Sequence, residues 1–362
     1  MKLRVFTKLL FVFPLALCSF FINAQGEPEK PPKLFPITKN FKYGYINKKG
    51  EIIIKPQFDW AIEFAEGMAR IEIKEKYGFI DTTGKVVIKP QFNMASDFSN
   101  GLALVKIPDG TCGLCGEWVF INKFGKVVIH TKPIIGQSKN VGDFSESLAS
   151  FEIEDKTKKV SEILPYGFMD KTGKVAIEPK FGYADEFHEG LAVVAKDFLR
   201  SGWGYINQKG DYVIAPRFSA AGDFHEGLAN VRIGSKWGFI DTTGNVVIEA
   251  KFNDVWAFSE GYALVKVDNK YGYIDKMGKF AIEPKFEWSW HFSEGLAPAE
   301  ENGKVGYINK QGAFVIPPRF EEVEYDGFSN GIARIFETYK INYPKKIGYI
   351  NKNGKYIWKP TV

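Results

Sequence analysis

Two cysteines give this chain its clearest candidate for chemistry by residue type and spacing. Cys112 and Cys115 stand two residues apart, a spacing typical of a redox centre, half of a metal site, or a local disulfide. A zinc site needs two further ligands, and no second cysteine pair exists. A thioredoxin-like centre needs a strand-to-helix junction, which the surrounding pattern does not predict. We therefore interpret this pair as a disulfide at a hairpin tip.

Two histidines recur at equivalent places. His188 and His225 each follow a phenylalanine and precede Glu-Gly, so neighbouring units could bring them side by side. Two imidazoles without a carboxylate partner make a weak metal site, and His130 and His291 are out of phase. The sequence therefore predicts solvated turn residues here, with no metal, no cofactor and no catalytic residue.

Acidic and amide residues also recur, in two turns. The first turn begins with Asn or Asp and has glycine three residues later, as in Asp81-Thr-Thr-Gly84. Free exchange of Asp for Asn fits a type I turn and argues against a calcium ligand. The second turn reads Phe-Ser-Glu-Gly, as in Phe258–Gly261, with Asn in place of Glu at Asn100 and Asn330. No second carboxylate recurs beside it, so we expect turn hydrogen bonding and not acid–base catalysis.

These turns belong to a repeat. Each copy opens with an aromatic residue, glycine, an aromatic residue, isoleucine and Asn or Asp. After the first turn come a β-branched segment, Pro-x-Phe, a second Phe, the second turn and an apolar strand. The period, 34 residues between Gly204 and Gly238, marks an array whose units are too small to bury their own apolar faces. The nine copies begin at Tyr43, Tyr77, Trp118, Tyr166, Trp203, Trp237, Tyr271, Val305 and Ile347.

The aromatic and β-branched content and the turn spacing predict strands and not helices. We expect an all-β fold: a tandem array of about nine short antiparallel β-meander repeats, either β-propeller-like or an open β-solenoid. Nine units exceed the usual propeller range of about four to eight blades, so both architectures stay open. Leu34-Phe-Pro-Ile37 resembles a strand that would complete the first unit. Extra residues lengthen copies near 108–116, 131–139 and 154–164 and after Phe336.

The motif W/Y-G-Y/F-I-D/N, followed by Pro-x-Phe and Phe-Ser-Glu-Gly, resembles the WG repeat family, also called KWG repeats. Lys236-Trp-Gly-Phe-Ile-Asp241 matches most closely, and the resemblance extends from about Phe41 to the C-terminus. That family is common in bacterial exported proteins and generally has no assigned biochemical activity. The resemblance therefore implies a repeat scaffold and transfers no catalytic residue. The aromatic residues that flank the motif glycine are expected to stack from unit to unit as a ladder. Four departures from the motif weaken this ladder locally: Val119, Ala250, Val305 and Ile347.

The N-terminus resembles a secretory signal peptide. A basic leader precedes the apolar run Leu9–Phe21, and Ala24 offers a small residue for cleavage. The alternative is a lipoprotein signal with lipid attachment at Cys18. We expect three parts: a signal peptide at 1–24, a linker and lead-in strand at 25–40, and the repeat domain at 41–362. The protein would be exported to the periplasm, the outer surface or the medium, with no transmembrane span in the mature chain.

Charge excludes some partners. The whole chain is formally +5. The leader carries Lys2, Arg4 and Lys8 and no acid, so the mature chain is 5 − 3 = +2. This near balance argues against nucleic acid as a partner.

Large aromatic residues vary between copies in the segment joining Pro-x-Phe to the second Phe. If they face inward they belong to the core, the interpretation we favour; if exposed, they form a stacking surface. The expected function is a non-enzymatic scaffold binding a protein or cell-surface ligand, or alternatively a carbohydrate-binding, lectin-like module. The candidate ligand-binding residues are Trp60, Tyr183, Trp256, Trp288 and Trp290.

Overall fold

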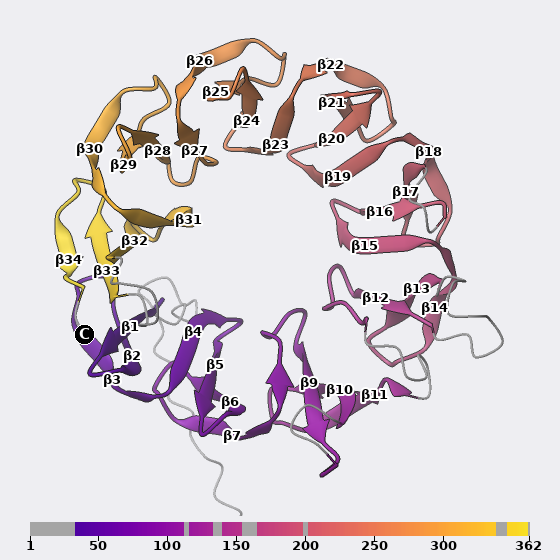
Figure 1. The fold of residues 1–362 in the computed structure, drawn as a ribbon. Coiled ribbons are helices and arrows are strands. Elements are labelled where there is room, and N and C mark those ends of the chain that lie inside the picture. Colours follow the sequence, from indigo (N-terminus) through magenta and orange to yellow (C-terminus); the bar gives the residue numbers. More distant parts are fainter. Residues whose placement is uncertain are drawn as a thin grey trace, which may run out of the picture. The chain divides into compact units, whose positions relative to one another are not determined.

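The nine repeats fold as nine antiparallel sheets arranged as the blades of a closed β-propeller (Figure 1). The all-β prediction is confirmed, and of the two predicted architectures the structure is the propeller. This computed structural model describes residues 33–111, 116–132, 140–153, 165–197, 202–337 and 346–360. The predicted signal peptide, Cys18, Cys112 and Cys115 lie outside these residues. Within them, no helix has the length and apolar character needed to cross a membrane.

Strand order within each blade follows the sequence, from the centre of the ring outward (Figure 1). The innermost strands, which contain the variable aromatic residues, are β4 (Trp60–Ala65), β8 (Met94–Ala95), β15 (Tyr183–His188), β19 (Ala220–His225), β23 (Asp254–Ser259), β27 (Trp288–Ser289) and β31 (Glu322–Ser329). The second strands are β1 (Phe35–Lys39), β5 (Met68–Ile73), β9 (Leu102–Pro108), β12 (Leu148–Glu152), β16 (Leu191–Ala195), β20 (Leu228–Ile233), β24 (Tyr262–Val267), β28 (Ala297–Glu301) and β32 (Ile332–Glu337).

The repeat motif itself forms the third strand of every blade. The third strands are β2 (Lys42–Ile46), β6 (Lys76–Asp81), β10 (Gly116–Asn122), β13 (Tyr166–Asp170), β17 (Trp203–Asn207), β21 (Lys236–Asp241), β25 (Lys270–Ile274), β29 (Lys304–Ile308) and β33 (Lys346–Asn351). The outermost strands are β3 (Ile52–Phe58), β7 (Val86–Phe92), β11 (Val127–His130), β14 (Val175–Phe181), β18 (Tyr212–Phe218), β22 (Val246–Phe252), β26 (Phe280–Phe286), β30 (Phe314–Phe320) and β34 (Tyr356–Trp358).

The motif glycine lies where the outermost strand bulges over the third strand. In blade 6, Trp237 pairs with Phe252 and Phe239 pairs with Ile248, so the outer strand has extra residues between the two pairs. A Cβ atom on Gly238 would lie 2.4 Å from the carbonyl oxygen of Ile248. Glycine at this position therefore permits the close approach of the outer strand's backbone.

Blade 3 shows why valine is tolerated at one copy of this position. Val119 pairs directly with His130, the last residue of the four-residue strand β11. The outer strand makes no bulge opposite Val119, so its side chain meets no crossing backbone. Loss of the glycine and loss of the bulge therefore occur together.

The second aromatic residue of the motif joins each blade to the next, but it packs against the second Phe of the next copy and not against its own counterpart, as the ladder prediction had it. Tyr45 of blade 1 contacts Phe64 of blade 2 at 4.9 Å between ring centroids, and its hydroxyl donates to the carbonyl of Ile62 at 2.7 Å. Seven equivalent junctions have centroid distances of 4.7–4.9 Å: Phe79–Phe98, Phe120–Phe144, Phe168–Phe187, Tyr205–Phe224, Phe239–Phe258, Tyr273–Phe292 and Tyr307–Phe328.

The glutamate of the second turn also links neighbouring blades. Glu260 of blade 7 accepts the backbone N–H of Gly295 in blade 8 at 2.9 Å, and Lys310 of blade 8 pairs with the same carboxylate at 3.4 Å. Glu226 and Glu294 form the same contacts with the blades that follow them. The recurring acid is thus explained by turn hydrogen bonding, as expected, although its partner is the next blade's turn and not its own.

Blade 1 closes the ring with an unusual residue. Its described part has three strands, and β1 occupies the second place, as Leu34–Ile37 predicted. Phe35 stands where the other blades have an alanine such as Ala69. It contacts Tyr349 of blade 9 at 5.7 Å between ring centroids. Phe35 therefore supplies the ninth aromatic pair in place of the phenylalanine of an inner strand.

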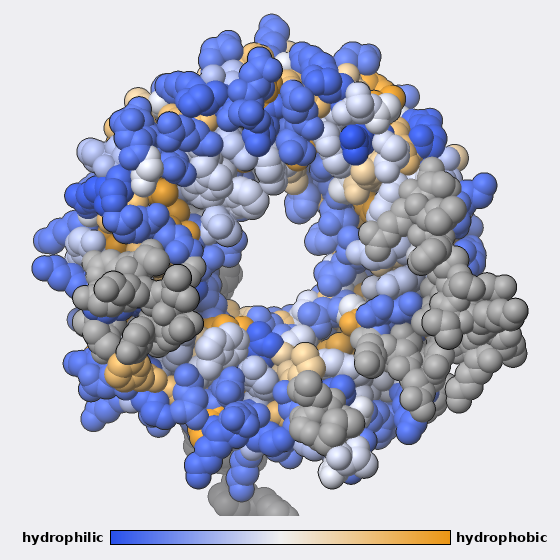
Figure 2. Space-filling view, in the orientation of Figure 1, coloured by the Kyte–Doolittle hydropathy of each residue, from blue (hydrophilic) through white to orange (hydrophobic). Residues whose placement is uncertain are grey.

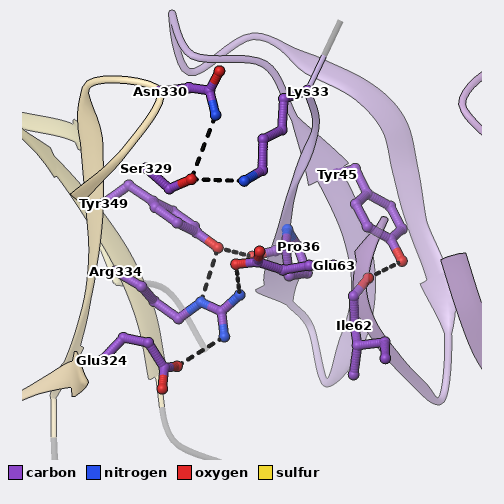
Figure 3. A network of polar contacts seen from close by, with 10 residues as sticks. All are labelled: Lys33, Pro36, Tyr45, Ile62, Glu63, Glu324, Ser329, Asn330, Arg334 and Tyr349. Carbon is purple, nitrogen blue, oxygen red and sulfur yellow. Dashed lines mark hydrogen bonds and ion pairs between the residues drawn. The ribbon is translucent and has the colours of Figure 1, made fainter. Parts of the chain in front are cut away.

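Polar contacts reinforce this seam (Figure 3). The Tyr349 hydroxyl donates to the carbonyl of Pro36 at 2.8 Å and accepts from the Nε of Arg334 at 3.0 Å. The Arg334 guanidinium also pairs with Glu63 of blade 2 at 2.8 Å and with Glu324 of its own blade at 3.0 Å. The first and last blades thus meet through the same kind of tyrosine–carbonyl bond that Tyr45 forms within the ring.

The innermost strand of blade 9 is longer than its counterparts. Phe320 and Phe328 are eight residues apart, whereas Phe286 and Phe292 are six apart in blade 8. The sequence predicted that the extra residues of this copy follow Phe336. This prediction is wrong for two of them. They lie in β31, which reaches toward the centre of the ring (Figure 1).

Candidate functional site

Three of the five predicted aromatic residues come together on the inner strands of blades 7 and 8. Trp256 contacts Trp290 at 5.9 Å between ring centroids, and Trp290 lies almost parallel to Trp288, with an interplanar angle of 10° and a centroid distance of 6.5 Å. All three side chains are half-buried. Trp256 and Trp290 pack against the core shared by blades 7 and 8, and Trp288 against the core shared by blades 8 and 9, while part of each ring stays exposed.

Tyr325, which sequence analysis missed, completes this cluster. Its ring lies 5.6 Å from Trp288 and 5.4 Å from Trp290, and it is 52% exposed. Tyr325 sits in the two-residue extension of β31, so the spacing of eight between Phe320 and Phe328 was the signal that could have revealed it. We call Trp256, Trp288, Trp290 and Tyr325 the aromatic cluster.

The other two predicted residues lie in separate blades and contact different partners. Trp60 meets Tyr77 edge-on at 6.1 Å, and the Arg70 guanidinium lies 5.2 Å from the Trp60 ring. Tyr183 lies between Tyr166 and Trp203, at 5.4 and 5.5 Å. The structure therefore does not unite the five residues in one site.

A cavity of about 200 Å³ opens beside the aromatic cluster. Its wall includes the aromatic side chains Trp288 and Tyr325 and the apolar Val305. Its remaining residues are mainly acidic: Glu300, Glu321, Glu322 and Val323. The cavity combines aromatic surface with carboxylates, both of which can recognise a ligand.

A larger cavity of about 470 Å³ lies between blades 3 and 4. Blade 4 has only three strands in its described part, and β8 of blade 3 has two residues, so the inner wall is thin here. Asp97, Asp143 and Glu186 line the cavity together with Arg70, which pairs with Asp97 at 3.4 Å.

Burial governs the titration of these three acids. It raises the pKa of Asp97 and of Asp143 above the usual carboxyl range, although the Arg70 charge opposes it in both. Burial also raises the pKa of Glu186, and the negative charge of Asp143 adds to this shift. Burial therefore makes the ionised form of each carboxyl less stable in the folded protein than in water.

The chain matches the sequence model of a known repeat family, and this match agrees with the repeated blades. The model of the WG-containing repeat matches seven stretches of the chain: 43–77, 77–112, 166–197, 203–237, 237–271, 271–304 and 306–340. The chain belongs to the WG-repeat family. The third copy, which contains Val119 and the short β11, falls outside the matched stretches. No curated protein matches the chain in sequence.

Solved structures similar to this WG-repeat protein show the fold alone. A eukaryotic initiation factor is 12% identical, with 90% of this chain and 95% of that chain covered and a TM-score of 0.60. Apo AztD from Citrobacter koseri is 10% identical, with 77% and 91% covered and a TM-score of 0.42. Sqt1 from Saccharomyces cerevisiae is 9% identical, with 80% and 91% covered and a TM-score of 0.38.

The recurring histidines of this WG-repeat protein do lie side by side. The rings of His188 and His225 are 5.6 Å apart, and His188 Nε2 lies 3.8 Å from Asp223. Burial lowers the pKa of His291, a neighbour of Trp290. Among the residues whose positions are described, no three His, Cys, Asp or Glu side chains are grouped to hold a metal ion.

We expect Asp143→Asn to stabilise the protein at neutral pH. A carboxyl whose folded pKa is raised contributes stability that is fully present below its unfolded pKa, about 3.9, and is lost as pH rises through the folded pKa. Removing the charge should therefore raise Tm at pH 7 by about 2 °C, as an effect on the order of 1 kcal/mol would. The gain should vanish at pH 3, measured by thermal unfolding.

Asp170→Asn serves as the opposite control. A hydrogen bond from Thr172 holds the pKa of Asp170 below its usual range, so its ionised form stabilises the fold and is lost as pH falls through that pKa. Asn occupies this turn position in other repeats, for example Asn207, and is compatible with the backbone. Asp170→Asn should lower Tm at pH 7; equal shifts of both variants would contradict the role of burial.

Proposed function

We propose that this WG-repeat protein is an exported, non-enzymatic scaffold that binds a partner protein through the aromatic cluster. The observation that carries the proposal is the contiguity of the cluster: side chains from three consecutive blades touch, yet remain half-buried or exposed. Recurring residues are occupied in blade-to-blade contacts. The cluster departs from the repeat, and partly exposed aromatic side chains are typical anchors of binding interfaces.

Its place in the molecule supports this proposal. The cluster lies on the innermost strands, beside the opening through the centre of the ring (Figure 1). Figure 2 shows that opening, with hydrophilic residues covering most of the visible face around it. A partner segment that entered there would meet aromatic surface on the side of blades 7 to 9.

Export is part of the proposal and rests on the basic leader, the apolar run and Ala24. The mass of the mature chain distinguishes its two forms, because cleavage after Ala24 leaves an N-terminal Gln25, whereas a lipoprotein would retain a modified Cys18. A chain found with its first 24 residues intact in the cytoplasm would contradict export.

The binding proposal is tested by affinity capture with the immobilised chain lacking residues 1–24. Proteins retained from an envelope extract of its native cells are identified, and the strongest is then titrated. Replacing Trp256, Trp288 and Trp290 together by Ala should weaken its binding at least tenfold, since aromatic hot spots each contribute about 2 kcal/mol or more. Tyr325→Ala, at an exposed position, should weaken it as well.

Tyr183→Ala is the matched control, because Tyr183 has the same place in blade 5 as Trp288 has in blade 8. It should bind the partner normally. Undiminished binding by the triple variant, with its β-structure confirmed by circular dichroism, would remove the aromatic cluster from the proposal.

The second candidate function is carbohydrate binding. The near-parallel indoles of Trp288 and Trp290 favour it, because flat aromatic faces can stack against sugar rings. A glycan array distinguishes the two: strong binding of uncharged oligosaccharides, lost in the triple variant, would support the lectin-like function over the protein scaffold.

A further inference from the structure

We propose that the 200 Å³ cavity beside Trp288 binds one positively charged side chain, a lysine or an arginine, of the partner protein. This names the ligand class of the site proposed above and rests on that proposal. The cavity combines the rings of Trp288 and Tyr325 with the carboxylate of Glu300. Aromatic faces and carboxylates both attract cations, and together they form a cage for an ammonium or guanidinium group.

Blade 2 contains the same arrangement with its cation already in place. Trp60 pairs with Glu72 across β4 and β5, as Trp288 pairs with Glu300 across β27 and β28. The Arg70 guanidinium lies 5.2 Å from the Trp60 ring and 5.7 Å from the Tyr77 ring. The two aromatic rings of this repeat position therefore accommodate an arginine within this very molecule, and its ion pair is with Asp97 of blade 3.

Blade 8 keeps the tryptophan and the glutamate of this position but has neither the arginine nor the tyrosine. Pro298 occupies the place of Arg70, because each lies two residues before the glutamate that pairs with the tryptophan. Val305 likewise occupies the place of Tyr77, since each is the first residue of its motif copy. The smaller valine leaves room beside Trp288, and it lines the cavity. Pro298 supplies no cation in the place of Arg70, so a partner's cation can occupy it.

The charge of the wall fits such a ligand. Three carboxylates line the cavity, those of Glu300, Glu321 and Glu322, and Lys304 forms an ion pair with Glu321. Glu300 is half-buried next to Trp288, where a partly desolvated carboxylate interacts more strongly with a cation than it would in water.

The size of the cavity selects one side chain and not a larger ligand. Sites for drug-sized molecules are about 300–1,000 Å³, so about 200 Å³ is too small for one. An arginine has a planar guanidinium that can lie on an aromatic face while it bonds a carboxylate, and arginine is enriched at binding hot spots. The extended β31 places Tyr325 at the entrance, as part of the wall.

The test uses blocked pentapeptides, Gly-Ser-X-Ser-Gly, with X as arginine, lysine or glutamine. Binding to the chain lacking residues 1–24 is followed by the indole N–H signals of 15N-tryptophan-labelled protein. The arginine and lysine peptides should shift the Trp288 signal in a saturable manner, and the glutamine peptide should not. Equal shifts from all three peptides would overturn the inference.

Two variants make the test specific. Val305→Tyr restores the aromatic residue common at this position, so it should fold normally while filling the cavity and reducing peptide affinity at least tenfold. Glu300→Gln keeps the shape and removes the charge, with a similar loss. Tyr183→Ala, in blade 5, should bind as the unchanged protein does. Unaltered affinity in both Val305→Tyr and Glu300→Gln would contradict the proposed cage.

The test of the cationic ligand can fail while the proposed scaffold function stands. If the captured partner depends on the aromatic cluster but binds Val305→Tyr and Glu300→Gln normally, the scaffold proposal stands and the cationic ligand is wrong. If an uncharged oligosaccharide binds and survives Glu300→Gln, the site is a carbohydrate site and the cationic ligand is again wrong. Loss of partner binding in all these variants supports both.

Discussion

Gly238→Ala is expected to lower the free energy of unfolding by about 3 kcal/mol, the upper end of overpacking effects. The alanine Cβ would lie 2.4 Å from the carbonyl oxygen of Ile248, and the next nearest atoms, in Ala250, also belong to the backbone. Neither side can yield by rotating a side chain. Relief requires the bulge of β22 to move, and this bulge also positions Phe252 in the core of blade 6. Urea unfolding followed by circular dichroism measures the loss.

Gly261→Asn separates the clash from ordinary loss of a glycine. Gly261 has a φ of +85°, but no atom lies within 4 Å of its Cβ position. Asparagine tolerates the left-handed region, so this variant should lose about 1 kcal/mol or less. If Gly238→Ala lowers the free energy of unfolding no more than Gly261→Asn does, the close approach of the two strands is not the reason that glycine is required at this motif position.

Phe35→Ala should have an effect of similar size, about 3 kcal/mol, because it removes a buried phenylalanine from the seam. Phe35 is 2% exposed and packs with Ile37, Ile332 and Tyr349. No peptide bond crosses the seam between blades 1 and 9. In Phe35→Ala we therefore expect the amides of β1 and β33 to exchange with deuterium much faster than those of blades 5 and 6.

Phe98→Ala is the corresponding change at an internal junction, where it removes the partner of Phe79. It should lower stability by a comparable amount, yet without selective exchange at the seam, since the chain still connects blades 2 and 3. Uniform exchange in Phe35→Ala would show that closure does not depend on this side chain.

The repeat made much of the fold predictable. Turn residues such as Asp81 and Gly84 and the strand at Leu34–Ile37 follow from local preferences that recur in nearly every copy. Closure did not follow from them. It involves Phe35, which pairs with Tyr349 as inner-strand phenylalanines do at the other junctions, and Arg334, which reaches Glu63. These contacts join residues about 300 positions apart, to which no local pattern corresponds.

The candidate site was predictable only in part, for a related reason. The sequence singled out Trp256, Trp288 and Trp290 because they vary among copies. It did not reveal that Tyr325 joins them, because two extra residues shift it out of the repeat register. Val305 was recognised as a departure that weakens the ladder. Its neighbours show that it also leaves a space, which depends on side chains from two blades.

In the part of the chain that the structure describes, the first and last blades share no strand, so adding or removing one unit would not disturb how the ends meet. Eight junctions use equivalent pairs of rings, and Phe35 forms the ninth pair from the start of the repeat domain. Tandem duplication of a 34-residue unit, such as the one between Gly238 and Gly272, would thus yield a wider ring from a single genetic event. The number of blades, and with it the width of the central opening, is a property that evolution can change stepwise.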